Sequence, residues 1–254
     1  LGQFYGYITE GLYQVDDFNY DASTQTYTLK DGIPYHGDKS RIRPGMWKFK
    51  NLTGDDNVID ENDKTVIGNA QPKFYGGLNN SFTYKGFDLS IFLTFSYGNE
   101  VLNATKLVTS KVGSLNYNAL DVMNSSNRWM TINSDGQKVT DPGELAALNA
   151  GKTVAAYHDA QQGDNYIHSW AVEDASYLKL SNVTLGYTFP KNLIARVGLK
   201  NLRLYATGNN LLTWTKYSGF DPEVSTMKSG LTPGVDFGAY PLSRSFIFGL
   251  NVAF

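Results

Sequence analysis

Several features that mark common protein classes are missing from the 254-residue sequence. It contains no cysteine, which excludes a disulfide framework and a thiolate metal site. No stretch approaches the roughly 18 consecutive apolar residues of a transmembrane helix. No basic segment followed by an apolar one opens the chain, as a signal peptide would. These absences exclude a disulfide-rich module and a helical membrane protein.

Charged and catalytic side chains are also sparse. Charged residues make up 18% of the sequence and the net charge is −2, so the chain lacks the basic surface that nucleic-acid binding requires. The three histidines, His36, His158 and His168, lie far apart and show no metal-ligand spacing. No nucleophile is paired with a base. We therefore expect neither a nucleic-acid-binding protein nor an enzyme.

Aromatic residues and glycine are abundant. The sequence has 17 tyrosines, 14 phenylalanines, 4 tryptophans and 25 glycines. This composition is typical of β-sheets with glycine turns and aromatic belts. We predict an all-β protein.

The last ten residues alternate almost perfectly between large apolar and small or polar side chains. The apolar positions are Phe246, Phe248, Leu250, Val252 and Phe254. A period of two indicates a strand with one apolar face. In a soluble protein that face would enter a core, whereas in an outer-membrane barrel it would face lipid and the other face would line a wet lumen.

The same alternation recurs upstream. The clearest case is a hairpin of residues 73–84 and 87–97, joined by a tight turn at Lys85 and Gly86. Its second strand carries apolar residues at every odd position from Phe87 to Tyr97, a length that would cross a bilayer when tilted. Further strands are predicted over 3–13, 177–189 and 202–214, with a β-bulge near Ser181 and Asn182, where the alternation slips.

The predicted strands sort their connections by length. The connections 85–86 and 190–201 are short and would lie on the periplasmic side. The connections 14–72, 98–176 and 215–243 are long and would lie outside. Short turns on one side and long loops on the other are the rule for outer-membrane barrels.

An acidic loop over residues 51–63 is the candidate cation site. Oxygen donors at alternating positions are how proteins wrap Ca²⁺, although Leu52 stands at the first ligand position. We predict no required cofactor and possible Ca²⁺ binding in this loop; a solvated acidic turn is the alternative. The candidate ligands are Asp55, Asp56, Asn57, Asp60 and Asp63.

The 98–175 excursion is the candidate substrate-binding region, because long irregular loops inside sheet proteins are usually functional. Trp129, Tyr166 and Trp170 are the candidate substrate-binding residues, as stacking platforms for sugar rings. The alternative is that these rings hold the loop onto itself. A short helix is predicted after Asp141 and Pro142, an N-cap followed by a first-turn proline.

An ordered set of motifs from about residue 45 to the end resembles the C-terminal part of SusC/RagA-type TonB-linked outer-membrane transporters of Bacteroidota. The motifs are DENDKTVIGN at 60–69 with PKF at 72–74, YKGFDLS at 84–90, VEDASYLKL at 172–180 with NVTLGY at 182–187, NNL at 209–211 with KYSGFDPE at 216–223, and YP at 240–241.

The resemblance implies an antiparallel transmembrane β-barrel of 22 strands, of which residues 1–254 would supply about six, with long extracellular loops and with the plug domain and N-terminal strands absent. It implies a multi-pass protein of the cell outer membrane that imports oligosaccharides or peptides. A SusD-like lipoprotein would be its partner, and the TonB complex would drive import through the missing N-terminal part. The alternative is a secreted soluble carbohydrate-binding β-domain.

Overall fold

Two compact units make up the chain. We call residues 1–2, 69–101 and 173–254 the sheet unit, and residues 3–68 and 102–172 the loop unit. A computed structural model describes residues 2–54, 56–110, 118–156, 166–226 and 232–254.

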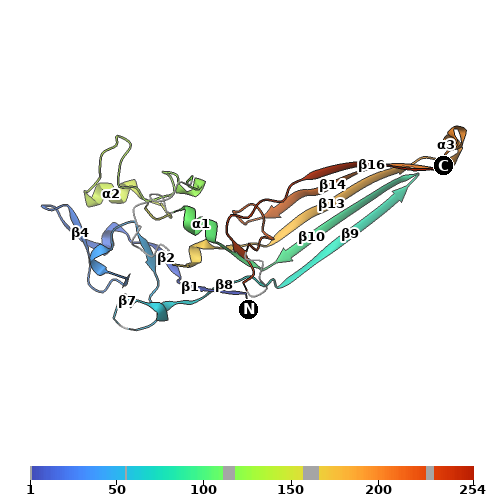
Figure 1. Ribbon diagram of the computed structural model, residues 1–254. Coiled ribbons are helices and arrows are strands. Elements are labelled where there is room, and N and C mark those ends of the chain that lie inside the picture. The colour runs from blue at the N-terminus through green and yellow to red at the C-terminus, as the bar shows by residue number, and fades with distance from the viewer. Residues whose placement is uncertain (1, 55, 111–117, 157–165, 227–231) are drawn as a thin grey trace. The chain divides into compact units, whose positions relative to one another are not determined.

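Five long antiparallel strands form the sheet unit, in the order β16-β14-β13-β10-β9 (Figure 1). Four of the predicted strands, and the alternating C-terminal segment, are therefore confirmed with boundaries that differ by at most one residue at either end. The observed bounds are β9 Phe74–Tyr84, β10 Phe87–Tyr97, β13 Tyr177–Thr188, β14 Asn201–Thr215 and β16 Ser245–Ala253.

Short connections join the strands at one end of this sheet. Lys85 and Gly86 both have positive φ angles, +48° and +89°, as a two-residue hairpin turn requires. The β13–β14 connection contains helix α3 (Lys191–Ile194) and a 3-10 helix (Ala195–Val197). The strands leave the other end into the long segments 98–176 and 216–244. The predicted sorting of connections by length is confirmed for these strands.

Apolar residues line up in rows across one face of the sheet. Directly paired residues in neighbouring strands share a face. Two rows run through all or most of the strands without a charged residue, with the row of Asn80, Ile91, Val183, Gly208 and Phe246 between them: Phe82, Leu89, Leu185, Ala206 and Phe248, and Leu78, Leu93, Leu180 and Leu212. These side chains are largely exposed, with Phe248 at 81% and Phe82 at 59%. We call this surface the apolar face.

Aromatic pairs mark both ends of the apolar face. The rings of Phe87 and Tyr187 lie 4.5 Å apart beside the short turn, and those of Phe74 and Tyr97 stack at 5.0 Å near the opposite end. Ten residue steps separate Phe87 from Tyr97, which at a tilt of about 40° rise about 25 Å, the height of the apolar band in outer-membrane barrels.

The opposite face of the sheet, which we call the polar face, carries rows of hydroxyl and amide side chains. One row consists of Ser81, Ser90, Thr184, Thr207 and Ile247, and the next of Asn79, Phe92, Asn182, Asn209 and Ser245. Cross-strand hydrogen bonds connect many of these groups. Asn182 donates to Asn209 at 2.7 Å, and Asn209 donates to Ser245 at 3.0 Å.

The predicted bulge is confirmed. The pairing of β13 with both neighbours shifts between Leu180 and Asn182. Against β10, Ser181 is an extra residue, whereas on the other side Asn210 and Leu211 of β14 lie opposite it. The Ser181 hydroxyl lies 2.7 Å from that of Thr94. Because of this bulge, Leu180 and Val183 share the apolar face although their positions differ in parity.

The loop unit contains short strands in separate two-stranded pairs. β1 pairs with β8, β2 with β6, β3 with β4, and β5 with β7. The bounds are β1 Gln3–Gly6, β2 Thr9–Leu12, β3 Phe18–Asp21, β4 Thr26–Leu29, β5 Tyr35–His36, β6 Trp47–Phe49, β7 Val58–Ile59 and β8 Thr65–Asn69. A further three-stranded sheet, most of whose residues belong to the sheet unit, has the order β12-β11-β15, with bounds Val172–Asp174, Glu100–Asn103 and Val235–Asp236.

The prediction that residues 3–13 form a sixth barrel strand is wrong. The segment breaks into β1 and β2, which pair with β8 and β6 and not with any strand of the long sheet. Several of its side chains are buried, including Phe4, Tyr7, Leu12 and Tyr13. Aromatic residues that resemble a membrane strand here serve a local core.

Short helices complete the loop unit. Helix α1 spans Ala104–Thr109 and α2 spans Pro142–Leu148. The α2 prediction is confirmed, since the Asp141 carboxylate accepts the Glu144 amide at 3.0 Å. The 3-10 helices are Val15–Asp17, Lys39–Arg41, Glu61–Asp63, Asp121–Met123 and Ser169–Ala171. None of the helices that the structure describes is long and apolar enough to cross a membrane.

Candidate functional site

The polar face of the sheet carries an ion pair that spans three strands. The Arg203 guanidinium of β14 donates to both carboxylate oxygens of Asp88 in β10, at 3.0 and 2.5 Å. Gly186 of β13 lies between them, and a Cβ atom there would collide with both side chains. The guanidinium also lies 5.1 Å from the centre of the Tyr205 ring. These two parallel hydrogen bonds hold both charged groups in place on the polar face of the sheet.

A second charged cluster joins β13 to the segment that follows β14. Lys179 is only 3% exposed, and its ammonium pairs with Glu223 and lies 3.5 Å from Asp221. The Tyr177 hydroxyl donates to the other oxygen of Glu223 at 2.5 Å. A buried lysine requires such partners, because an unpaired charge would be costly away from water. The cluster therefore holds residues 221–223 onto the polar face.

Tyr217 anchors the same segment from its other side. Its side chain is 5% exposed, and its hydroxyl donates to Asp236 at 2.5 Å. Burial, together with the hydrogen bond to Asp236, raises the pKa of the Tyr217 phenol. The phenol therefore remains protonated and keeps donating at physiological pH. Glu173 accepts hydrogen bonds from the amide and the hydroxyl of Ser218, both at 2.9 Å.

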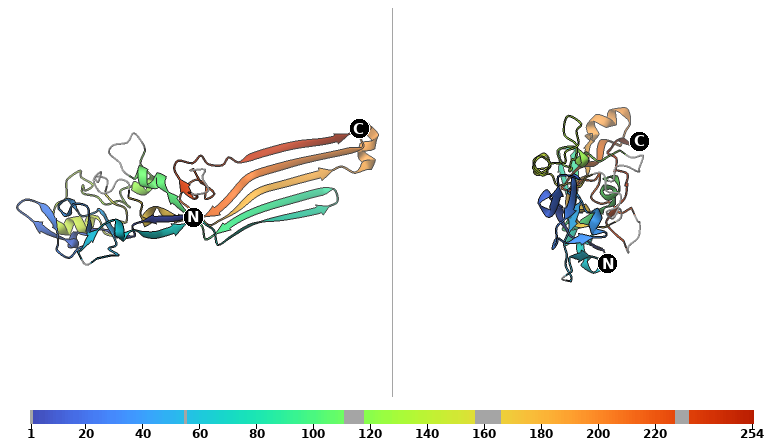
Figure 2. Two further views of the ribbon diagram at one scale, coloured as in Figure 1. Left: turned by 60° about the horizontal axis from the view of Figure 1, so that its bottom comes forward. Right: turned by 90° about the vertical axis from the view of Figure 1, so that its left-hand side faces the viewer.

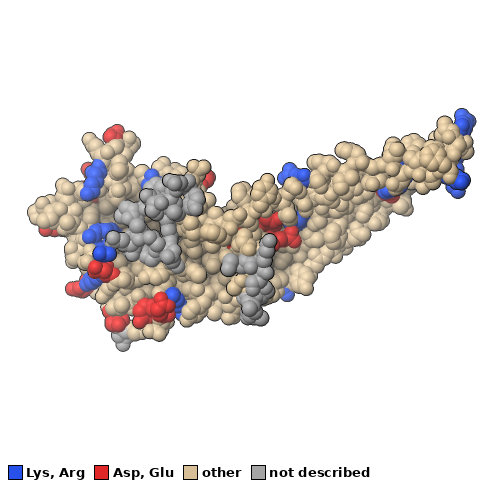
Figure 3. Space-filling model, viewed as in Figure 1, with Lys and Arg blue, Asp and Glu red and all other residues tan. Residues whose placement is uncertain are grey.

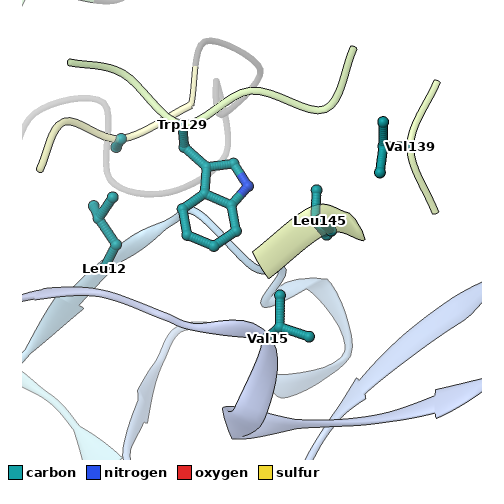
Figure 4. Close-up of a cluster of buried hydrophobic side chains, with 6 residues drawn as sticks. Leu12, Val15, Trp129, Val139 and Leu145 are labelled. Carbon is teal, nitrogen blue, oxygen red and sulfur yellow. The ribbon is translucent and has the colours of Figure 1, made fainter. Parts of the chain in front are cut away.

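The predicted substrate-binding tryptophan Trp129 lies in a core. It is 1% exposed and packs in a cluster with Leu12, Val15 and Leu145 (Figure 4). Its ring has no open face on which a sugar could stack. The placement favours the alternative reading for this residue, in which the ring holds the loop onto itself.

Tyr166 and Trp170 lie in a different cluster from Trp129, and both are half-buried. The Tyr166 ring meets that of Tyr7 edge to face at 5.2 Å. The Trp170 ring is 5.1 Å from Trp47, and the Lys106 ammonium lies 4.1 Å from its centre. These neighbours contact part of the surface of each ring. Substrate binding by Tyr166 and Trp170 stays a prediction.

Two histidines belong to this aromatic cluster, which sequence spacing did not indicate. His36 is 5% exposed, and its ring lies 4.9 Å from Phe49 and 5.6 Å from Tyr166. Burial lowers the pKa of His36 to about 4, so the ring is neutral at physiological pH. His168 lies 5.4 Å from Phe49 on the other part of the cluster.

The acidic loop is organised around one carboxylate. Asp63 is fully buried and accepts hydrogen bonds from the amides of Leu52, Thr53 and Asp60 at 2.7 to 2.8 Å. Burial alone would raise the pKa of this carboxyl, but the hydrogen bonds outweigh burial and hold the pKa below its usual value. The Asp63 oxygens are thus already engaged with backbone donors.

The other predicted cation ligands do not gather around Asp63. The Asp60 carboxylate caps the 3-10 helix by accepting the Asn62 amide, and Asp56 accepts the Val58 amide. Asn57 has a left-handed φ of +57°. Asp55 lies outside the described residues. Among the described residues, no group of three or more His, Cys, Asp or Glu side chains is arranged to hold a metal. Calcium binding stays a prediction.

The sequence did contain signals for the ion pairs. Asp88 and Arg203 both occupy the polar parity of their strands, where a charge faces water and can meet an opposite charge on a neighbouring strand. Lys179 stands between two leucines of an otherwise apolar stretch, which marks it as a lysine with a specific partner. The strand order, which identifies these partners, is not encoded locally.

Known proteins resemble the chain over most or all of its length. TonB-dependent receptor P3 of Formosa agariphila is 34% identical over 259 residues, covering 100% of this chain and 22% of that protein. TonB-dependent receptor SusC of Bacteroides thetaiotaomicron is 29% identical over 204 residues, covering 78% of this chain and 17% of that protein. No family model matches the sequence. The chain spans about a fifth of the length of these relatives.

A solved structure shows the same fold. The RagAB peptide importer in its closed-closed state matches with a TM-score of 0.63 and 21% identity, covering 99% of this chain and 23% of the matched chain. The long sheet is therefore a section of an antiparallel outer-membrane β-barrel, and it is not closed among the described residues.

The sequence relatives and the shared fold show that this chain belongs to the TonB-dependent receptors. Within that class, this chain is a segment of the SusC/RagA type, as the ordered motifs predicted. The relatives are named as receptors and not as enzymes, which agrees with the expectation that the chain has no catalytic role.

Proposed function

We propose that the protein of which this chain is a segment imports oligosaccharides or peptides across the outer membrane. The observation that carries the proposal is the two-faced sheet, with apolar rows on one side and a hydrogen-bonded polar wall on the other. An apolar face about 25 Å tall between aromatic pairs suits lipid, and a polar wall suits a wet passage. The named relatives are receptors of this kind.

The proposal includes an orientation and a location. The protein resides in the cell outer membrane as a multi-pass barrel, with the Lys85–Gly86 turn and α3 on the periplasmic side. The segments 98–176 and 216–244 lie outside, where substrate arrives. A plug blocks the lumen of a 22-stranded barrel, so import requires energy to move that plug. We propose that the TonB complex supplies this energy through a part of the protein outside this chain.

The proposal also includes a partner, a SusD-like lipoprotein that covers the outer opening. The relative SusC and the RagAB importer support such a partner by resemblance. For this chain the partner would meet the long outer segments, because only these lie on the side from which substrate comes.

Uptake in living cells tests the proposal. A strain lacking the receptor gene is complemented with the complete gene, and uptake of labelled oligosaccharide and peptide mixtures is compared. We expect uptake of one class to return, and to be lost again when either tonB or the gene for the lipoprotein is deleted. Unchanged uptake in the receptor-deleted strain for every mixture would contradict import as the function.

A further inference from the structure

Basic side chains gather where the long sheet has its short connections (Figure 3). They are exposed, and we call them together the basic end: Lys85, Lys191, Arg196 and Lys200. The sequence contains no acidic side chain between residues 178 and 220, and between 74 and 97 it contains only Asp88. Asp88 is already paired with Arg203. The positive charge of the basic end is therefore not balanced by a neighbouring carboxylate of these strands.

The cations of the basic end have no ionic partner in the protein. Within the part of the chain that the structure describes, none of the four forms an ion pair. The Lys85 ammonium lies 5.2 Å from the centre of the Tyr84 ring, which is itself 70% exposed. Unpaired surface cations of one sign attract an anion that approaches from outside.

Backbone hydrogen bonds hold these residues at one edge of the sheet. The Thr188 amide donates to the Gly86 carbonyl at 2.7 Å, which joins the β9–β10 turn to the start of the β13–β14 connection. The Lys200 amide donates to the Ala253 carbonyl at 2.7 Å, which joins the end of that connection to β16. The four cations therefore belong to one fixed surface and not to separate turns.

Apolar side chains are exposed among these charges. Leu193 of α3 is 55% exposed, and Val197 of the following 3-10 helix is 71% exposed. Between them Ile194 is buried, and its carbonyl accepts the Leu199 amide at 3.2 Å, so the connection is a folded element. Exposed leucine and valine next to lysine and arginine are typical of segments that lie at a membrane surface.

The apolar face of the sheet reaches the same end. One of its last cross-strand rows consists of Phe87, Tyr187, Leu204 and Leu250. The Tyr187 ring meets that of Phe189 at 4.9 Å, just before α3. Aromatic rings at the end of an apolar band lie where hydrocarbon gives way to headgroups. The residues that follow Phe189 are therefore at headgroup depth if the apolar face is covered by lipid.

We propose that the basic end binds the headgroups of anionic phospholipids in the periplasmic leaflet of the membrane. The lipid phosphates pair with the cations, while Leu193 and Val197 reach the boundary of the acyl chains. A soluble anion would satisfy the charges but not the two apolar side chains, and a neutral lipid would satisfy the apolar side chains alone. This inference rests on the membrane location and orientation of the proposed function and is independent of import.

Native mass spectrometry of the whole receptor in a non-ionic detergent tests the proposal, with phosphatidylglycerol and phosphatidylethanolamine as the probes. The test variant is the triple change Lys191→Gln, Arg196→Gln and Lys200→Gln; Lys85 is kept because its φ is positive. We expect the test variant to bind phosphatidylglycerol about fivefold more weakly, the contribution of one basic side chain at an anionic headgroup. Binding of phosphatidylethanolamine should be unchanged.

The matched control removes the same number of charges elsewhere. Lys73→Gln, Lys138→Gln and Lys216→Gln change three exposed lysines that lie outside the short-connection end, and this variant should keep the affinity for phosphatidylglycerol. Equal affinities of the two triple variants would overturn the proposal. Because lipid binding is measured on purified receptor and uptake in cells, failure of this test would leave the uptake test of import unaffected.

A second comparison separates a lipid from a soluble anion. Leu193→Ser with Val197→Ser should weaken phosphatidylglycerol and phosphatidylethanolamine by the same factor, because it removes only the apolar contact. Inorganic phosphate should displace phosphatidylglycerol no better than sodium chloride of equal ionic strength. Unchanged binding of both lipids by the serine variant, or specific displacement by phosphate, would show an anion site and overturn the assignment to lipid.

Discussion

Single side chains do much of the ordering in the irregular parts of this protein. Asp63 is the clearest case, because one buried carboxylate closes a loop of about ten residues by accepting several backbone amides. Lys179 and Tyr217 do the same for the segment after β14. In both places a polar side chain is buried because it satisfies backbone groups or charges that would otherwise be unpaired.

The Asp63→Asn variant is expected to loosen the acidic loop. Replacing an acceptor-only carboxylate by an amide removes charge-assisted hydrogen bonds and costs about 2 kcal/mol. The measurement is hydrogen exchange of the Leu52 and Thr53 amides, which should accelerate. Asp56→Asn is the matched control in the same loop, because Asp56 is exposed; equal acceleration in both variants would contradict the role of Asp63.

The same carboxylate predicts a pH dependence. Its pKa is lowered in the folded protein, so its contribution to stability is present above the unfolded pKa of about 3.9 and is lost as the pH falls through the folded value. We expect loop exchange relative to the rest of the chain to be unchanged from pH 7 to pH 5. Selective loosening of the loop already at pH 5 would count against a lowered pKa.

At the scale of elements, the strands are defined by their two faces. In the row across the sheet, Leu93 lies between Leu78 and Leu180, while its neighbour Phe92 lies between Asn79 and Asn182. The chemical identity of adjacent residues therefore says little about their surroundings: both side chains are apolar, yet one lies on the apolar face of the sheet and the other on the polar face.

Changing these two residues to arginine tests the facing. Leu93→Arg is expected to cost about 2–4 kcal/mol of stability in a bilayer, because it places a charge near the lipid midplane. Phe92→Arg is the matched control and should cost much less, since it enters the polar wall. Urea titration of the whole receptor folded into lipid vesicles measures both; equal losses would contradict the assignment of faces.

The bulge at Ser181 sets which face each half of β13 presents. Deleting Ser181 removes the residue that is extra against β10, so Leu178 and Leu180 turn to the polar face while Lys179 turns to the apolar face, or the half of β13 from Asn182 onward turns over instead. We expect the deletion to prevent assembly of the receptor, as measured by resistance to protease in outer membranes. Ser181→Ala keeps the residue count and should assemble normally; a deletion variant that assembles equally well would show that the bulge is dispensable.

At the scale of the whole molecule, charge and hydrophobicity are separated in space. In the view of Figure 3 the long sheet is mostly uncharged between its ends, and charged side chains gather at the end near α3. The left view of Figure 2 shows the five strands running together over their length. A soluble protein rarely exposes a continuous apolar face of this extent.

An outer-membrane barrel and a secreted soluble domain are expected to partition differently between detergent and water. The whole receptor is expected to remain in the detergent phase when a Triton X-114 extract is warmed, because the apolar face needs detergent or lipid to cover it. The periplasmic soluble fraction of the same cells is the comparison. Recovery of a folded monomer from that fraction in plain buffer would instead support the secreted carbohydrate-binding alternative.

The sequence by itself determined the five long strands of the sheet unit, their faces, the turn at Lys85 and Gly86, the bulge at Ser181 and the cap of α2. These features follow from local rules, since a period of two, a turn dipeptide and an N-cap are each complete within a few residues. The ordered motifs added the class of protein, because several short matches in one order are specific together.

Only the tertiary structure decided which distant residues meet. It showed that 3–13 joins a local core and not the long sheet, that Trp129 is buried, and that Arg203 reaches Asp88 across β13. The physical reason is that the local sequence of a strand, or the presence of a charged residue, does not specify its partner. The partner is selected by packing and pairing between segments far apart in the chain.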